Sequence, residues 1–114
     1  MHKYVHMWLL KHIGIGLLLV SNSVLADKPI FELIIREHLF YPAELVIPAG
    51  QKVKLLISNE DSTPEEFESY ELNREKVILG GKKTIIFIGP LKAGEYPFFG
   101  EFNMATAQGK IIAK

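Results

Sequence analysis

Hydrophobic and polar residues alternate along two segments of the chain, as they do in strands with one buried face. Residues 31–37 place Phe31, Leu33 and Ile35 on one side, and residues 52–59 alternate in the same way. Residues 83–88 are mostly β-branched and apolar, which is typical of a strand buried on both faces or nearly so. The pattern therefore predicts a strand in each of these three segments.

Shorter apolar stretches lie between turn residues such as those of Gly80-Gly81. Further strands are expected within residues 41–50, 76–79, 96–99 and 110–113, and a short strand or a turn within residues 65–72. The turn signals recur at intervals of about ten residues, and no segment has a convincing helical pattern. We therefore predict an all-β, antiparallel Greek-key sandwich of about seven to eight short strands.

Residues 1–26 have the pattern of a secretory signal peptide. Lys3 and Lys11 precede an apolar core at residues 13–20, and small residues follow, with Val24 and Ala26 at the positions that a signal peptidase reads. The core is about half the length of a membrane anchor, although an uncleaved N-terminal anchor is the alternative. We predict a periplasmic protein with a signal peptide at 1–26, one domain at 27–114 and no membrane anchor after cleavage.

The composition excludes several classes of function. The chain has no cysteine, which excludes disulfides, thiol catalysis, iron–sulfur clusters and thiolate metal sites. Residues 27–114 contain 11 of the 13 basic residues and all 13 acidic ones, without the basic stripe expected of a nucleic-acid-binding protein. They also contain a single histidine and no nucleophile elbow, so a hydrolytic triad has no residues from which to form.

Two stretches of sequence resemble the cupredoxin family. FYPAELVIPAG (40–50), followed by VKLLISN, resembles the first half of a cupredoxin, and LKAGEYPFF (91–99) with GKII (109–112) resembles the second. The acidic residues 64–76 and residues 99–103 are most similar to small periplasmic cupredoxin-like proteins of the EfeO type, which are associated with iron uptake. The resemblance implies a β-sandwich and a role beside an iron permease.

The resemblance also implies where a blue-copper site would lie, and the usual ligands are missing there. The family takes one His from the turn near Glu65, and Cys, His and a weak Met from the loop after Phe98. Here the first position holds Glu65, or Glu66 if the turn is longer, and the Cys and second His positions fall near Gly100 and Asn103. Without a thiolate, a type 1 copper site is excluded.

The remaining donors define a candidate metal site. Its residues are His38, Glu65, Glu66, Glu68, Glu101 and Met104. Strand alternation places Glu66 and Glu68 together on the face opposite Phe67. Oxygen-rich ligands with one imidazole suit iron, manganese, zinc or copper(II), although Met104 comes earlier in the loop than the usual axial ligand.

Two alternatives are open for these residues. Carboxylates this close raise each other's pKa unless a cation lies between them; that cation is either a metal ion or the side chain of Arg74 or Lys76. His38 is either a surface or turn-capping residue or the nitrogen ligand of the metal.

Three functions fit these observations. The first is an accessory metal-binding component of iron or copper transport, and the second is a copper-dependent ferrous oxidase. The third is a metal-free interaction module that docks onto a membrane permease. The expected partner is such a permease or a periplasmic iron-uptake protein, and the acidic end is also a candidate homodimer interface.

Overall fold

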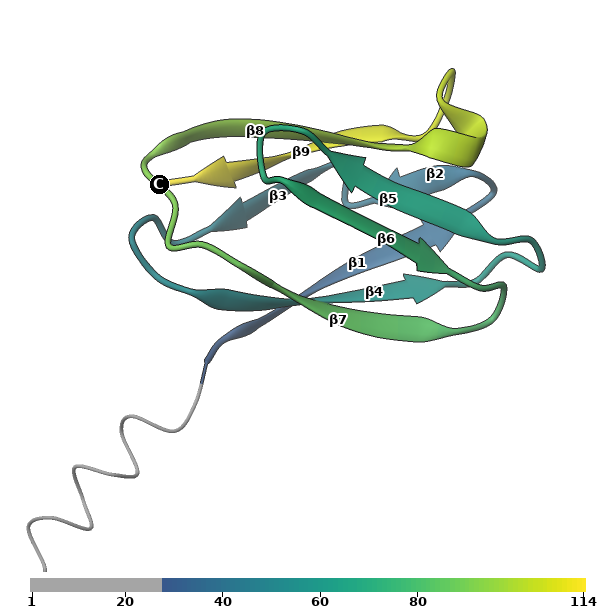
Figure 1. Cartoon of the computed structure of the whole chain (residues 1–114), viewed down its shortest axis with the longest axis horizontal. Coiled ribbons are helices and arrows are strands. Elements are labelled where there is room, and N and C mark those ends of the chain that lie inside the picture. Colours follow the sequence, from purple (N-terminus) through teal and green to yellow (C-terminus); the bar gives the residue numbers. More distant parts are fainter. Residues whose placement is uncertain (1–27) are drawn as a thin grey trace, which may run out of the picture.

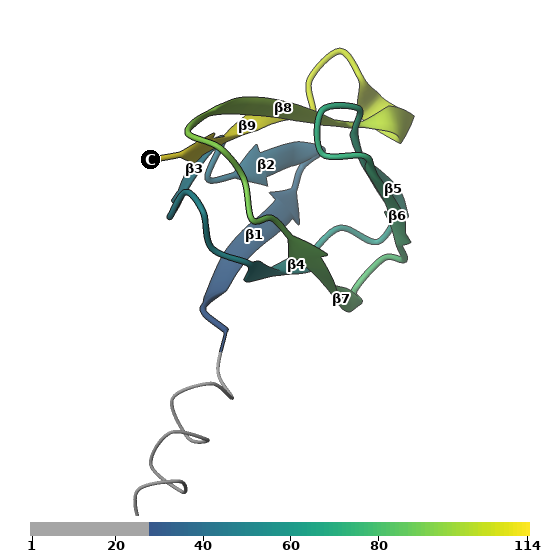
Figure 2. The same ribbon diagram turned by 60° about the vertical axis from the view of Figure 1, so that its left-hand side comes forward.

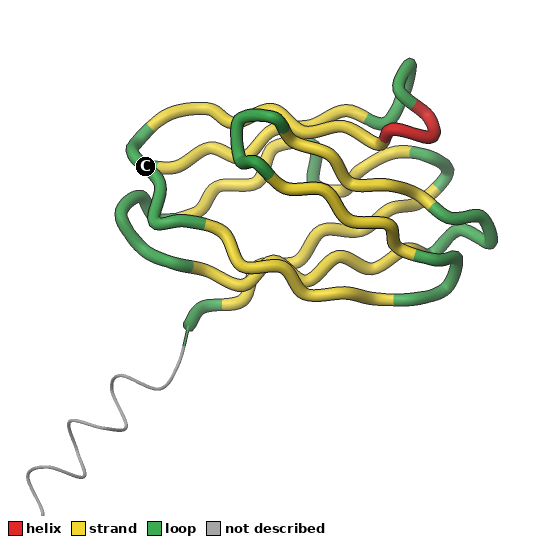
Figure 3. The backbone as a smooth tube through the Cα atoms, in the orientation of Figure 1, coloured by secondary structure: helices red, strands yellow, loops and turns green. Residues whose placement is uncertain are grey.

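The computed structural model describes residues 28–114, so the predicted signal peptide lies outside the described residues. These residues form nine strands and one short 3₁₀ helix, and the strands build two sheets that face each other (Figure 1). Strands and their connecting loops account for nearly all of this part of the chain (Figure 3). Within residues 28–114, no helix has the length and apolar character needed to cross a membrane.

The two sheets differ in size. The four-stranded sheet has the order β2 (Leu39–Tyr41), β1 (Ile30–Arg36), β4 (Val53–Asn59) and β7 (Lys83–Ile88). The five-stranded sheet has the order β3 (Glu44–Ile47), β9 (Gln108–Ala113), β8 (Gly94–Gly100), β5 (Glu65–Ser69) and β6 (Arg74–Ile78). The helix η1 (Glu101–Asn103) follows β8, and the turned view shows the sheets on opposite sides of the core (Figure 2).

The predicted β-sandwich is confirmed, but two features of the strand pairing differ from the expectation. The described residues contain nine strands rather than seven or eight, and the pairs β1–β4 and β3–β9 are parallel. After the β1–β2 hairpin the chain crosses to the five-stranded sheet, where it forms β3. It then returns to the four-stranded sheet as β4, which runs parallel to β1. Alternation of apolar residues does not encode strand direction, so the sequence pattern could not reveal this.

The core lies between the inward faces of the two sheets. Alternating residues of β1 and β4, among them Leu33 and Ile57, are fully buried. In the five-stranded sheet, the rings of Phe67 and Phe98 pack with their centroids 5.1 Å apart. Phe40, from β2 of the four-stranded sheet, meets Phe98 edge to face with a centroid distance of 4.9 Å. These aromatic contacts supply much of the apolar burial of a domain without disulfides.

β7 is less buried than predicted. Ile85 and Phe87 are 47% and 43% exposed, because β7 forms the edge of the four-stranded sheet and the outer face of that sheet is open. The prediction that β7 is buried on both faces is therefore wrong. A continuous apolar run alone does not distinguish a central strand from an edge strand.

One end of the sandwich gathers most of the polar residues considered below. The β1–β2 hairpin, the end of β4, the start of β5, the end of β8 and η1 all meet there, on the right in Figure 1. Contacts between η1 and β5 place the C-terminal loop against the acidic strand.

Candidate metal centre

Three carboxylates meet on the outer face of the five-stranded sheet. Glu66, Glu68 and Glu101 each offer one oxygen atom, and these atoms all lie within 4.8 Å of one another. Phe67 points into the core, so its neighbours Glu66 and Glu68 share the outer face of β5. Glu101 begins η1 directly after β8, which pairs with β5. The structure thus brings together three of the six predicted metal-site residues.

A fourth carboxylate, Glu75, lies beside this cluster and was not predicted. In the β5–β6 hairpin Glu75 is directly opposite Glu68, and, after burial, the negative charge of Glu75 raises the pKa of Glu68. Had the sequence analysis paired these strands as a hairpin with its turn at residues 70–73, it would have predicted that Glu68 and Glu75 lie side by side. The sequence analysis missed Glu75 because it did not pair these two strands.

The cluster concentrates negative charge at a partly buried position. Burial raises the pKa of Glu66, and the adjoining carboxyl of Glu101 raises it further. Burial also raises the pKa of Glu68, followed by the charges of Glu75 and Glu101. Glu68 is only 7% exposed, and its buried Oε2 has no hydrogen-bond partner in the part of the chain that the structure describes. Such an oxygen is costly to bury unless a cation or a donor satisfies it.

Arg74 and Lys76 do not neutralise the cluster. The Arg74 Nε donates a hydrogen bond to the backbone carbonyl of Phe87 at 3.0 Å, so the guanidinium reaches across to the other sheet. Lys76 is opposite Phe67 in the strand register, on the face away from Glu66 and Glu68. The salt bridges between the described residues involve other side chains. The predicted ion-pair alternative is therefore not formed.

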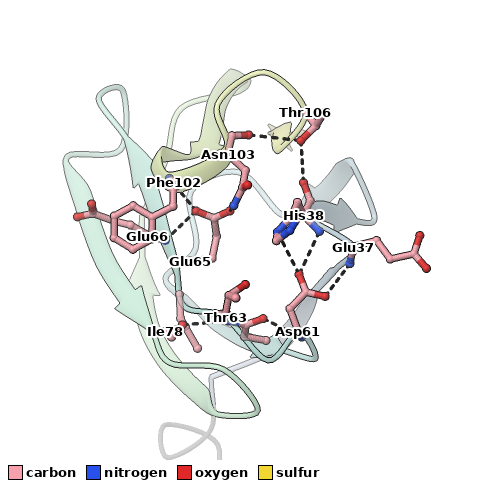
Figure 4. Close-up of polar contacts among 11 residues, drawn as sticks. Glu37, His38, Asp61, Thr63, Glu65, Glu66, Ile78, Phe102, Asn103 and Thr106 are labelled. Atoms are coloured by element: carbon pink, nitrogen blue, oxygen red, sulfur yellow. Dashed lines mark hydrogen bonds and ion pairs between the residues drawn. The ribbon is translucent and has the colours of Figure 1, made fainter.

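Glu65 points the other way, into the end of the sandwich (Figure 4). It is 1% exposed, and its Oε1 accepts hydrogen bonds from the backbone N–H groups of Glu66 at 3.0 Å and Phe102 at 2.9 Å. Its Oε2 accepts a third from the Asn103 side-chain amide at 2.8 Å. These three donors give both carboxylate oxygens a hydrogen-bond partner, and Glu65 is separate from the outer cluster.

The region where the resemblance places copper ligands is therefore filled by protein. A Cβ atom at Gly100 would lie 2.6 Å from the Glu65 Cδ, so Gly100 leaves the space that this carboxylate occupies. Glu65, Gly100 and Asn103 do converge, but they offer neither a thiolate nor an imidazole. The residues present do not fit a blue-copper ion.

His38 lies at the same end of the sandwich but outside the carboxylate cluster. Glu37 and His38 form the tight β1–β2 turn with φ angles of 53° and 61°. The Asp61 carboxylate accepts both of their backbone N–H groups, at 2.7 and 3.0 Å, which lowers the pKa of Asp61. The His38 Nδ1 is 3.6 Å from the same carboxylate. His38 is thus a turn residue paired with Asp61.

Met104 follows η1, and its side chain is 53% exposed. Its backbone carbonyl accepts a hydrogen bond from the Gln108 side chain at 3.0 Å. Among the described residues, no polar contact joins its sulfur atom to the three carboxylates. Of the six predicted residues, His38 and Glu65 therefore lie apart from the cluster, and Met104 has no described polar contact with it.

Comparison with known proteins adds family information to this geometry. The sequence profile described as a cupredoxin-like domain matches residues 9–113. An uncharacterised protein of Rickettsia prowazekii (strain Madrid E) is 45% identical over 78 residues, which cover 68% of this chain and 62% of that protein. This chain therefore matches less than two thirds of the length of its curated relative.

Two solved structures illustrate the likeness of fold. Auracyanin A, a "blue" copper protein from Chloroflexus aurantiacus, has a TM-score of 0.67 at 14% identity, covering 77% of this chain and 100% of that one. The metal-binding domain of the Cu(I)-exporting P-type ATPase CopA of Streptococcus pneumoniae D39 has a TM-score of 0.60 at 15% identity, covering 75% and 84%. At these identities the likeness establishes a shared fold.

Proposed function

This chain belongs to the cupredoxin-like domain family, and we propose that it is an exported protein that binds a metal ion outside the blue-copper position. The cation is held by Glu66, Glu68 and Glu101, with Glu75 beside them. The observation that carries this proposal is the Oε2 of Glu68, which is buried and has no hydrogen-bond partner among the described residues. It lies in a cluster of carboxylates that forms no salt bridge within residues 28–114. A metal ion supplies the charge that the cluster lacks.

The donor set favours a hard or borderline cation. All donors are carboxylate oxygens, which suit iron, manganese and similar ions better than the soft Cu(I) ion. Several carboxylates also balance the charge of a divalent or trivalent ion. Solved relatives of this fold bind copper, but the imidazole of His38 and the sulfur of Met104 are not part of this cluster.

We place this activity in iron transport, as an accessory to a membrane permease or a periplasmic uptake partner. Support comes from the similarity of residues 64–76 and 99–103 to EfeO-type proteins and from the signal-like pattern of residues 1–26. A ferrous oxidase is a weaker candidate, because such an enzyme needs a copper ion that cycles rapidly. The position where this family holds such an ion is filled by Glu65.

Replacing Glu66 and Glu68 together with Gln tests the proposed site. The double variant keeps the shape of both side chains but removes two of the three charged ligands, so we expect metal affinity to fall by more than about 100-fold. Isothermal titration with Mn²⁺, with Fe²⁺ under argon and with Cu²⁺ measures this loss and ranks the ions. His38→Ala should leave the affinity unchanged, because that imidazole lies against Asp61.

The matched control is the double variant Glu32→Gln and Glu44→Gln, which removes the same charge from exposed positions in other strands. Equal affinity in the two double variants would exclude the cluster as the binding site. A wild-type protein that binds none of the three ions would favour the metal-free docking module instead.

A further inference from the structure

A single oxygen atom of Glu65 contacts both segments that carry the cluster. The Oε1 accepts the backbone N–H of Glu66, which is itself a member of the cluster, at 3.0 Å. The same atom accepts the N–H of Phe102, the residue directly after Glu101, at 2.9 Å. Strand β5 and helix η1, which are 37 residues apart at this contact, are thus joined behind the outer carboxylates.

We propose that Glu65 is a positioning residue that holds Glu66 and Glu101 at the separation needed for cation binding. This inference rests on the proposed function. Glu65 does not touch the cation; it acts through the backbone of the residues beside the ligands, as outer-shell partners do in many metal sites. Glu65 fills the region where the resemblance to cupredoxins places copper ligands, and it thereby supports a different site on the outer face of the sheet.

Helix η1 depends on such support. It contains three residues, none of them buried, and its N-cap residue Gly100 provides no side-chain hydrogen bond. A single helical turn is not stable on its own. Two hydrogen bonds to Glu65 tie this turn to β5. The Asn103 carbonyl also accepts bonds from within the loop, from the Ala107 N–H at 2.8 Å, the Thr106 N–H at 3.2 Å and the Thr106 Oγ1 at 3.5 Å. Loss of Glu65 would therefore release the end of the loop that carries Glu101.

The burial of Glu65 strengthens this link. A low local dielectric increases the strength of a hydrogen bond. Water has little access to this carboxylate, which is 1% exposed. The position of Phe102 relative to Glu66 is therefore set by protein contacts rather than by solvent.

Three variants test the proposal in the full chain with Mn²⁺ as the probe. Glu65→Ala should weaken Mn²⁺ binding by about 10- to 100-fold without changing the stoichiometry. Glu65→Gln should restore binding to within a few-fold of wild type, because its amide oxygen still accepts both backbone N–H groups. Ile88→Ala, at the opposite end of the core, should lower stability but leave Mn²⁺ affinity unchanged.

A metal-free measurement tests the same positioning independently. In the wild type, the backbone N–H groups of Glu66 and Phe102 donate to the same Glu65 oxygen, which holds them close together. The nuclear Overhauser effect between these two amide protons should weaken in Glu65→Ala and persist in Glu65→Gln. If Glu65→Ala does not fold, Asn103→Ala removes one of the three bonds and should weaken Mn²⁺ binding by up to about tenfold.

The outcomes separate this inference from the proposed function. Wild-type Mn²⁺ affinity and an unchanged nuclear Overhauser effect between the Glu66 and Phe102 amide protons in Glu65→Ala would overturn the positioning role and leave the site intact. Equal losses of affinity in Glu65→Ala and Ile88→Ala would overturn it as well, since general destabilisation would then explain both. If the wild type binds no metal, the proposed function fails, and the nuclear Overhauser effect between the Glu66 and Phe102 amide protons still decides whether Glu65 holds the two segments together.

Discussion

Glu65 and Gly100 show how two residues change the chemistry available at one end of a cupredoxin-like sandwich. Glu65 is buried at an inward position of β5, beside Phe67, where most strands carry an apolar residue. It is tolerated there because three N–H groups satisfy its oxygens. The absent side chain of Gly100 provides the space, so the two residues form a complementary pair.

Gly100→Ala should destabilise the protein because the new methyl group would overlap the Glu65 carboxylate and Ala107. We expect a loss of about 1–3 kcal/mol in the free energy of unfolding, as for other overpacked cores. Urea unfolding of Gly100→Ala, Glu65→Ala and the double variant measures the coupling between them. The double variant should lose less than the sum of the single losses. Strict additivity would show that Gly100 is not reserved for Glu65.

At the scale of strands and turns, apolar alternation identified the inward residues of β1 and β4 and placed Glu66 with Glu68 on the outer face of β5. Apolar residues that recur at every second position can be recognised directly in the sequence. It gives neither strand direction nor register, which is why two parallel pairs and the Glu68–Glu75 pair were missed.

The candidate site was predictable to a similar extent. The acidic composition of residues 65–68 and the position of Glu101 in the C-terminal loop indicated a convergence that the structure shows. The separation of Glu65 and His38 from that convergence was not predictable. It depends on the hydrogen bonds of Glu65 with η1 and of Asp61 with the β1–β2 turn, which join segments far apart in the sequence.

The Asp61 side chain stabilises the β1–β2 turn from the neighbouring β4–β5 loop. Asp61→Ala removes the acceptor for the N–H groups of Glu37 and His38, and we expect it to cost about 1–3 kcal/mol of stability. Thermal or urea unfolding measures this change. Ser62→Ala, at an exposed position in the same loop, is the control. Equal stability of the two variants would show that the turn does not need Asp61.

At the scale of the whole molecule, the acidic cluster makes stability depend on pH. The folded pKa values of Glu66 and Glu68 lie above the ordinary value of 4.5, so the folded protein binds more protons than the unfolded chain between these values. Stability of the metal-free protein should therefore fall as pH rises through the raised pKa values. Asp61, whose pKa is lowered from 3.8, contributes in the opposite sense and only at lower pH.

Urea unfolding at a series of pH values above 4.5 tests this dependence. The wild type should lose stability with rising pH, and the Glu66→Gln and Glu68→Gln double variant should show a much smaller slope. Saturating Mn²⁺ should remove or reverse the wild-type slope, because the cation binds the ionised carboxylates and competes with protons. Identical slopes in wild type and double variant would mean that these glutamates do not titrate differently in the folded state.

The central claim is that a cation binds on the outer face of the five-stranded sheet. It does not bind in the region that Glu65 fills, where the resemblance to cupredoxins places copper ligands. A crystal grown with Mn²⁺ and measured for anomalous scattering locates that ion directly. We predict one strong peak among the carboxylates of Glu66, Glu68 and Glu101, with Glu65 still bonded to Phe102 and Asn103. A peak at Glu65 or between His38 and Asp61, or no peak at saturating Mn²⁺, would contradict the account.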